Sequence, residues 1–301
     1  MVILVCGASD DSQIALLARS LKRKAADFLV LEEEAMADEV QLRWQIVDRG
    51  LTGKVRVGSR LFDVHGISGV YHRFVNPEDL FDSTRHANKT RSVLRALMDL
   101  LDVLPTRVVN RRRSMMSNNS KPYQALLIRQ AGFMVPETLV TNDDAALQKF
   151  ASKVGPLVYK SISSARSVVA PLDEKALEKI GSLRYLPTQF QRRIAGLNVR
   201  VHVVGRRLFA TQALTTALDY RYASTEGVSV RLKPYELTLE WQRRCLHLAR
   251  LCGLAFTGID MIVSEQGVYC LEVNPSPGYS YYQEATGQRI SDALAAYLMK
   301  A

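Results

Sequence analysis

Two apolar stretches near the C-terminus carry three polar side chains, and they read Gly258-Ile259-Asp260-Met261-Ile262-Val263 and Val268-Tyr269-Cys270-Leu271-Glu272-Val273-Asn274. A carboxylate buried in an apolar strand is costly unless it is paired with a cation or binds a metal ion. Two carboxylates and one amide offer only oxygen ligands, a set that suits Mg²⁺ or Mn²⁺. The two stretches therefore predict buried strands that hold a metal ion, such as the magnesium of a nucleotide.

The spacing of these residues predicts that all three ligands share one face of a hairpin. Glu272 and Asn274 are two positions apart, so both point to the same side of a strand. Residues 265–267 are expected to form a three-residue loop with Gly267 in the left-handed conformation, which places Asp260 opposite Glu272. The alternative, that the two carboxylates end strands on the solvent side, is weaker because their neighbours are too apolar for exposed edges.

Length and composition predict a globular protein of two or three lobes. The chain has 301 residues, of which 47% are hydrophobic and 23% are charged. Lys and Arg number 40 against 30 Asp and Glu, and the net charge of +10 favours an anionic partner: a nucleotide, an acidic peptide or nucleic acid. Nucleic acid is the least favoured of these, because the sequence shows no RNA-binding signature, zinc pattern or basic–aromatic stripe.

The sequence also predicts where the protein resides. No apolar run is long enough for a transmembrane helix. Residues 1–7 lack the basic region of a signal peptide and are expected to form a buried strand. The four cysteines lie in apolar contexts without the spacing of metal ligands, as in reduced proteins. We therefore expect a cytoplasmic protein without a membrane segment, and the sequence leaves open whether it forms a homo-oligomer.

Alternating strands and helices in residues 1–105 predict an N-terminal α/β lobe with a parallel sheet. The expected strands are residues 2–6, 28–31, 61–64 and 69–74, and a helix is expected over 90–104. Residues 106–185 are expected to form a central lobe. It begins with a helix from Lys121 to Gly132 and continues with a strand over 135–141, a helix over 143–152 and a strand over 156–161.

Residues 186–301 are predicted to form the C-terminal lobe, which contains the hairpin described above. A strand over 198–205 alternates strictly, with three valines on one face and Asn198, Arg200 and His202 on the other. Because the valine face is core, Arg200 faces either solvent or a cleft. A hairpin partner over 208–214 and helices over 237–252 and 290–298 complete this lobe.

Several residues outside the hairpin are candidates for binding phosphates or a base. Lys160 ends a strand before the Ser-rich loop 161–167, whose backbone N–H groups are suited to phosphates. Lys121 lies at a helix start, where the helix dipole favours anions. Taken singly, each lysine is more typical of a solvated surface charge. Residues 190–194 form either an inter-lobe strand that reads adenine or an ordinary connecting strand, and Arg221 either reaches the site or pairs with Asp219.

Together these segments resemble the ATP-grasp superfamily of carboxylate–amine ligases, and within it the ribosomal-protein glutamate ligases and the graspetide (microviridin-type) peptide macrocyclases. The resemblance covers about residues 105–300 and rests on Asn119-Ser120-Lys121, Val158-Tyr159-Lys160, Phe190-Gln191-Arg192-Arg193-Ile194, Asn198-Val199-Arg200-Val201, Gly258-Ile259-Asp260 and Glu272-Val273-Asn274-Pro275-Ser276-Pro277-Gly278. It implies the ATP-grasp fold, which is of the α/β class with α+β lobes, preceded by an N-terminal α/β pre-ATP-grasp domain.

The resemblance also implies ATP and Mg²⁺ or Mn²⁺ as cofactors and a role for each candidate residue. The residues expected to bind the nucleotide are Lys121, Lys160, Gln191, Arg192, Arg193, Ile194 and Asn198. The expected metal ligands are Asp260, Glu272 and Asn274. The residues expected to stabilise phosphoryl and acyl-phosphate oxygens are Arg200 and Arg221.

The implied function is ATP-dependent ligation. A peptide or amino-acid carboxylate is activated as an acyl phosphate and joined to an amine or a hydroxyl, giving ADP and phosphate. An acidic peptide is the expected substrate of this basic chain. Two alternatives stay open: a free amino-acid ligase that makes dipeptides, and a catalytically silent ATP-binding sensor or scaffold. The intact set of three metal ligands speaks against the second alternative.

Overall fold

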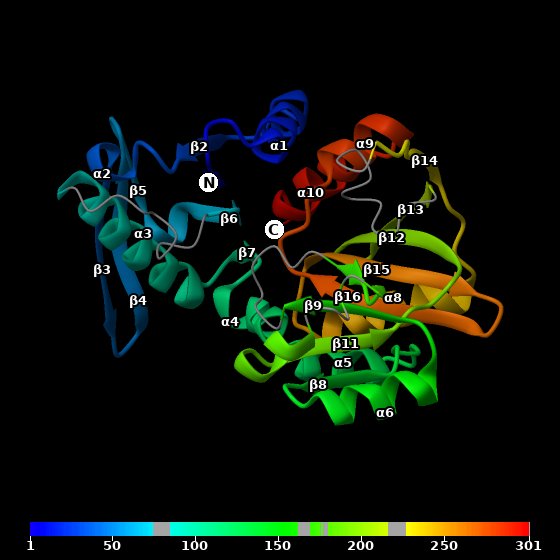
Figure 1. Ribbon diagram of the computed structural model, residues 1–301. Helices are drawn as coiled ribbons and strands as arrows, with labels where there is room; N and C mark the ends of the chain where they lie inside the picture. Colours follow the sequence, from blue (N-terminus) through cyan, green and yellow to red (C-terminus); the bar gives the residue numbers. More distant parts are fainter. Residues whose placement is uncertain (75–84, 162–168, 175, 177–179, 216–226, 301) are drawn as a thin grey trace.

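The computed structural model describes residues 1–74, 85–161, 169–174, 176, 180–215 and 227–300, and their strands form four sheets. In Figure 1 the N-terminal part of the chain (blue to cyan) lies on one side and the sheets of the remainder (green to orange) lie on the other. The C-terminal helices (red) lie at the top of the view. Every helix in the described part of the chain is too short or too polar to cross a bilayer.

The first sheet is parallel, with the order β2-β1-β6-β7. Its strands are β1 Val2–Gly7, β2 Phe28–Glu32, β6 Ile67–His72 and β7 Arg107–Val109. All of β1 is buried, because both faces of a parallel sheet are covered. Ile3 and Val5 pack with helix α1 (Ser12–Arg23), whereas Val2 and Leu4 pack with α3 (Arg85–Val103). The predicted α/β lobe with a parallel sheet is confirmed.

A three-stranded antiparallel sheet extends from this lobe, and the sequence analysis found only its last strand. It consists of β3 Val40–Val47, β4 Gly50–Val57 and β5 Arg60–Asp63, flanked by α2 Met36–Glu39 and η1 Val64–Gly66. Leu42 and Trp44 of β3 pack on the lobe, but Ile46, which continues their alternation, is 70% exposed. This break in the pattern explains why the strand is hard to recognise in the sequence.

The second sheet is antiparallel, with the order β10-β9-β11-β8. Its strands are β8 Thr138–Thr141, β9 Leu157–Ser161, β10 Ala170–Pro171 and β11 Thr188–Arg192. Helix α6 (Asp144–Val154) is capped by Asp143, whose carboxylate accepts the N–H groups of Ala145 and Ala146. The helix packs on the sheet through Leu147. The other elements of this region are α4 Arg112–Met115, η3 Met116–Asn119, α5 Lys121–Gln130 and η4 Ile180–Tyr185.

The third sheet has the order β14-β13-β12-β15-β16 and carries the hairpin. Its strands are β12 Leu197–Val204, β13 Arg207–Leu214, β14 Arg231–Pro234, β15 Phe256–Ser264 and β16 Gly267–Asn274. Val199, Val201 and Val203 form one buried core with α5 and with α8 (Leu239–Leu251). The predicted alternation of β12 is confirmed, since its valine face packs on α5 and α8 and its other face carries Asn198, Arg200 and His202.

The hairpin pairs Asp260 with Glu272 as predicted, but the predicted loop is wrong. Ser264 pairs with Gly267, so the loop contains Glu265 and Gln266 alone. The register that brings the carboxylates together instead arises at Leu271, an extra residue between the pairs Met261–Cys270 and Asp260–Glu272. Gly267 does have a positive φ, of +136°, and a Cβ there would lie 2.9 Å from the sulfur of Met134.

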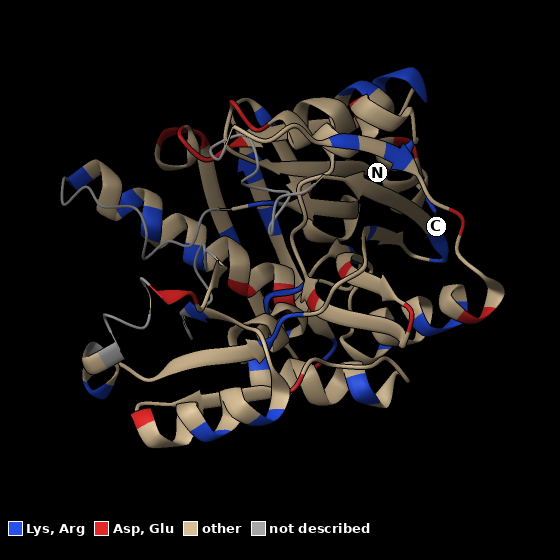
Figure 2. Cartoon of the chain, turned by 45° about the vertical axis from the view of Figure 1, so that its right-hand side comes forward, with Lys and Arg blue, Asp and Glu red and all other residues tan. Residues whose placement is uncertain are grey.

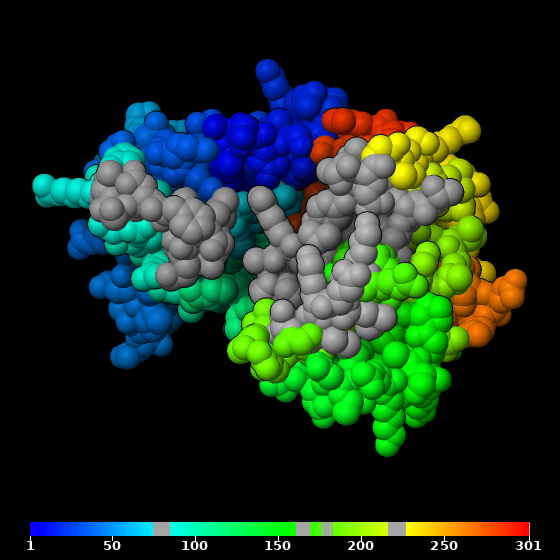
Figure 3. Space-filling view, viewed as in Figure 1, coloured from blue at the N-terminus to red at the C-terminus, as the bar shows by residue number. Residues whose placement is uncertain are grey.

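Two elements join the N-terminal lobe from beyond the predicted boundary at residue 105. One is β7, which pairs with β6. The other is α10 (Ile290–Leu298), which follows α9 (Ser280–Thr286) and packs on α1, with Ser20 Oγ 2.9 Å from Ser291 Oγ. Figure 3 shows the blue N-terminal segment in contact with the red C-terminal segment. The three domain ranges stay predictions.

Candidate active site

A pocket of about 510 Å³ lies between the second and third sheets, within the usual range of about 300–1,000 Å³ for small-molecule sites. It brings together eight of the residues that the sequence predicted for the site: Lys160, Gln191, Arg192, Arg193, Ile194, Asn198, Asp260 and Glu272. Each side of the pocket therefore supplies part of the predicted site. The second sheet supplies the basic side chains and the hinge, and the third sheet supplies the carboxylates.

The acidic wall of the pocket is formed by the hairpin. Asp260 and Glu272 are cross-strand partners and both line the pocket. Asn274 follows on the same face of β16, and its Oδ1 accepts the N–H of Ser276 at 2.9 Å. Asn274 is not among the residues that line the pocket, and the described residues contain no group of three His, Cys, Asp or Glu side chains that could hold a metal ion. The predicted donor set therefore stays two carboxylates and an amide. This set fits Mg²⁺, which is usually held by one or two carboxylates and completes its shell with water and phosphate oxygens.

Arg200 is held against this wall. It is directly opposite Asp260 across β12 and β15, and its Nη1 donates to Asp260 Oδ2 at 2.6 Å. The side chains are only 5% and 13% exposed, and the ring of Tyr282 lies 5.9 Å from the guanidinium carbon. The guanidinium occupies the space over Gly258, where a Cβ would lie 2.1 Å from Nη2. Of the two positions that the sequence left open for Arg200, solvent is excluded by its burial, and the side chain lies against Asp260 without being among the residues that line the pocket.

His202 lies beside Arg200 on the same face of β12 and is fully buried. Its Nε2 is 3.0 Å from the carbonyl oxygen of Gly278, so Nε2 carries the proton and donates it. Burial and, to a smaller extent, the charge of Arg200 lower the pKa of His202 to about 3. The imidazole is therefore neutral at physiological pH, and its hydrogen bond to Gly278 holds the loop after Asn274.

The predicted adenine hinge is the end of β11. The amide of Arg192 donates to Glu137 O at 2.9 Å, and that of Arg193 donates to Pro156 O at 2.8 Å. Gln191 Nε2 donates to Thr138 Oγ1 at 2.9 Å. These bonds fix the predicted hinge to its neighbouring segments. Because the N–H groups of Arg192 and Arg193 are already used in them, a base would have to form its hydrogen bonds with other backbone groups.

The remaining predicted residues differ in how the structure places them. Lys160 is buried, with 8% exposure, in β9 and lines the pocket. Lys121 is the first residue of α5 and is not among the lining residues. One turn further along this helix, the side-chain amide of Gln124 forms hydrogen bonds with the N–H and the C=O of Val273 in β16. Arg221 and most of the Ser-rich loop 161–167 lie outside the described residues.

The sequence analysis missed the apolar lining of the pocket. The residues concerned are Pro136, Pro156, Val158, Val169, Val199, Met261, Ile262 and Leu271. Val158 could have been found by alternation, because it lies two positions before Lys160 on the same strand face. Leu271 could not have been found in this way, because adjacent residues of a regular strand point to opposite faces. The bulge lets both Leu271 and Glu272 line the pocket.

Two sheets that enclose a pocket with an acidic wall and the buried Lys160 are the arrangement expected for the class of ATP-grasp ligases. Residues 117–298 match the family model described as a RimK-like ATP-grasp domain. This match covers more than half of the sequence, and the chain therefore belongs to the RimK-like ATP-grasp family. The fold and the reaction class predicted from the sequence, ATP-dependent ligation of a carboxylate to an amine, are confirmed.

Individual relatives are similar over most of the chain. A probable alpha-L-glutamate ligase of Alkalilimnicola ehrlichii is 25% identical over 215 residues, which cover 68% of this chain and 71% of the relative. The ATP-grasp ligase PsnB, solved with minimal precursor, Mg and ADP, has a TM-score of 0.80 at 25% identity over 99% of this chain and 96% of that chain. The macrocyclase MdnC of Microcystis aeruginosa, bound with precursor peptide MdnA, has a TM-score of 0.80 at 22% identity over the whole of both chains.

Proposed function

We propose that this chain uses ATP to activate a carboxylate of a peptide and joins it to an amine or a hydroxyl, releasing ADP and phosphate. The observation that carries the proposal is the facing pair Asp260 and Glu272 in a pocket that also contains Lys160. The presence of ADP and Mg with a precursor in the PsnB complex, and of a precursor peptide on MdnC, supports the same assignment.

The pocket offers apolar side chains for the base and charged side chains for the phosphates. Val158, Ile194 and Leu271 offer an apolar surface beside the hinge. Lys160, together with Lys121 at the start of α5, supplies positive charge for the phosphates. Asp260, Glu272 and Asn274 would hold Mg²⁺ or Mn²⁺, and bound metal neutralises charge that develops on the phosphate oxygens.

The reaction needs no nucleophilic side chain. An oxygen of the substrate carboxylate attacks the γ-phosphorus of ATP, the bond from this phosphorus to the bridging oxygen breaks, and ADP leaves with the electron pair. The nitrogen of an amine, or the oxygen of a hydroxyl, then attacks the carbonyl carbon of the acyl phosphate. Phosphate leaves and the nucleophile loses its proton. Arg200 and Arg221 stabilise the oxyanion, a role in which removing one donor typically lowers kcat about 100- to 1,000-fold.

The substrate that we favour is an acidic peptide. The chain carries a net charge of +10, and Lys and Arg are spread over many parts of it in Figure 2. Arg192 and Arg193 add positive charge at the pocket itself. A chain of this charge attracts anionic peptides more strongly than the zwitterionic amino acids that a dipeptide ligase would use.

Replacement of Glu272 tests the proposal, with Glu265→Ala in the exposed loop of the same hairpin as the matched control. The protein is incubated with ATP, Mg²⁺ and acidic peptides or amino acids, and ADP, AMP, phosphate and pyrophosphate are measured. We expect equal amounts of ADP and phosphate from the unmodified protein and from Glu265→Ala, and at least a 100-fold lower rate from Glu272→Ala. Formation of AMP and pyrophosphate, or full activity of Glu272→Ala, would contradict the proposal. Turnover with free amino acids alone would identify a dipeptide ligase.

A further inference from the structure

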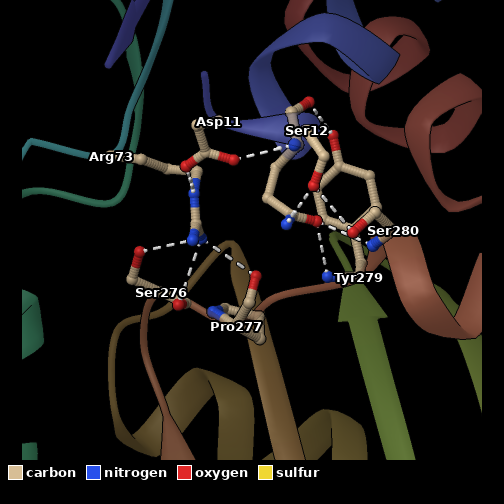
Figure 4. A network of polar contacts seen from close by, with 8 residues as sticks. Asp11, Ser12, Arg73, Ser276, Pro277, Tyr279 and Ser280 are labelled. Carbon is tan, nitrogen blue, oxygen red and sulfur yellow. Dashed lines mark hydrogen bonds and ion pairs between the residues drawn. The ribbon is translucent and has the colours of Figure 1, made fainter. Parts of the chain in front are cut away.

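Residues 275–280, which follow the predicted metal ligand Asn274, are held by side chains of the N-terminal lobe (Figure 4). Arg73 follows β6 and donates from Nη1 to Ser276 O and Ser276 Oγ, each at 3.2 Å, and to Pro277 O at 3.0 Å. Its Nε donates to Asp11 Oδ2 at 2.7 Å. The guanidinium thus connects the N-terminal lobe directly to the segment that leaves the metal-binding strand.

The partner of Arg73 is itself fixed by the fold. Asp11 caps α1, and its Oδ1 accepts the N–H of Gln13 at 2.7 Å while Oδ2 holds Arg73. Both charged side chains are 17% exposed, so solvent screens the pair less than a surface ion pair. Gln13 extends the same contact, since its Oε1 accepts the N–H groups of Tyr279 and Ser280 at 2.8 and 2.7 Å.

A continuous path of hydrogen bonds runs from Arg73 to Asn274. Arg73 fixes the carbonyl and hydroxyl of Ser276, and the N–H of Ser276 donates to Asn274 Oδ1. The orientation of the amide oxygen of Asn274 therefore depends on where Ser276 is held. Groups that orient a metal ligand in this way typically change metal affinity about 10- to 100-fold when they are removed.

We infer that Arg73 is a positioning residue, which sets the metal affinity of the active site from the N-terminal lobe by fixing Ser276 and thereby Asn274. The inference rests on the proposed function, which makes Asn274 a ligand. It assigns to the N-terminal lobe a part in metal binding, although none of its residues lines the pocket in the described part of the chain.

Equilibrium binding of ADP over a series of Mg²⁺ concentrations tests this inference without any turnover. Arg73→Lys keeps the charge but loses the planar fork that reaches Asp11 and Ser276 together. We expect this variant to need about tenfold more Mg²⁺ for half of the Mg²⁺-dependent ADP affinity, with nearly unchanged ADP affinity at saturating Mg²⁺. Arg60→Gln is the matched control, because Arg60 forms an ion pair with Asp27 in the same lobe, 3.0 Å long, away from this loop.

Asp11→Asn provides a second variant in case Arg73→Lys folds poorly. Asn caps a helix as well as Asp does, so α1 is retained while Arg73 loses its charged partner. We expect a smaller shift in the same direction. If both variants require the same Mg²⁺ as the unmodified protein, or if both lose ADP affinity equally at every Mg²⁺ concentration, the inference is wrong. If the unmodified protein shows no Mg²⁺-dependent ADP binding, or Glu272→Ala retains it, the proposed function itself fails.

Discussion

At the scale of single residues, the buried ion pair between Arg200 and Asp260 matters more for the geometry of the site than for stability. Taking both charges out of water is expensive, and the attraction between them only roughly repays that cost. Removing one partner would leave an uncompensated buried charge and would lower the free energy of unfolding by about 3–5 kcal/mol. The pair therefore adds little to stability, and its value is that it keeps a cation beside the acidic wall with a fixed orientation.

His202 makes the stability of the protein depend on pH. Its pKa is about 3 in the folded state and about 6.5 when unfolded, so below pH 6.5 the unfolded chain binds a proton that the folded chain does not. Its contribution to stability is complete above pH 6.5 and is lost as the pH falls toward 3. The variant His202→Gln retains a hydrogen-bond donor for Gly278 O but does not titrate. Between pH 6.5 and pH 4.5 we expect its free energy of unfolding to fall by about 2 kcal/mol less than that of the unmodified protein.

Urea unfolding at the two pH values measures this difference. The exposed His65, replaced by Gln in the same way, serves as the control and is expected to follow the unmodified protein. An equal loss of stability in His202→Gln and in the unmodified protein would show that His202 does not titrate as described.

At the scale of elements, β16 is the edge strand of the third sheet, and its outer edge is covered by a single β-bridge to Met134 and, further along, by helix α5. Gln124 of α5 is 3% exposed, donates from Nε2 to Val273 O at 2.8 Å and accepts the N–H of Val273 at 2.9 Å. Its amide thus replaces a neighbouring strand at the residue between Glu272 and Asn274. Buried backbone groups need such partners, and this one also aligns α5 with the acidic wall.

Replacing Gln124 by Leu keeps the size of the side chain and removes both bonds. We expect the free energy of unfolding to fall by about 1–3 kcal/mol, because the N–H and C=O of Val273 are left buried and unsatisfied. Gln130→Leu, at the exposed end of the same helix, should change stability by less than about 0.5 kcal/mol. Chemical denaturation of the two variants gives the comparison, and equal stabilities would contradict this account of the edge.

At the scale of the whole molecule, the chain returns to its starting lobe before it ends. Leu294 and Leu298 of α10 are fully buried in one core with Ile3, Val5 and Leu17. Arg23 and Asp292 add an ion pair of 2.8 Å across the same contact. The N-terminal sheet therefore depends on residues nearly 290 positions away, and the lobe is complete only when the C-terminal helix has docked.

This dependence predicts an effect at a distance in the sequence. Leu294→Ala should destabilise by about 2–5 kcal/mol, as for other buried leucines, and should increase amide hydrogen exchange in β1 and β6. Leu147→Ala removes an equally buried leucine from the core under the second sheet, and should increase exchange in β9 and β11 instead. Faster exchange in the same strands for both variants would argue against a separate docking of α10.

Much of the fold and of the site follows from local features of the sequence. The alternation of β12, the paired apolar stretches around Asp260 and Glu272, and the cap and proline that start α5 are each visible within a few residues. The three-stranded sheet and the apolar lining were not predicted, because their patterns are irregular or because a bulge changes the side to which a residue points.

By itself, the sequence determined the class of chemistry, ATP-dependent ligation, and it predicted the carboxylates, amide and lysines that we propose for the site. These are properties of short segments, in which burial on one face imposes a regular period. Only the tertiary structure decided which residues support that chemistry. Arg73 is bonded to Ser276, 203 positions away, and the bulge at Leu271 sets the register of the hairpin. Contacts between such distant segments leave no periodic trace in a single sequence, so they appear only when the chain is folded.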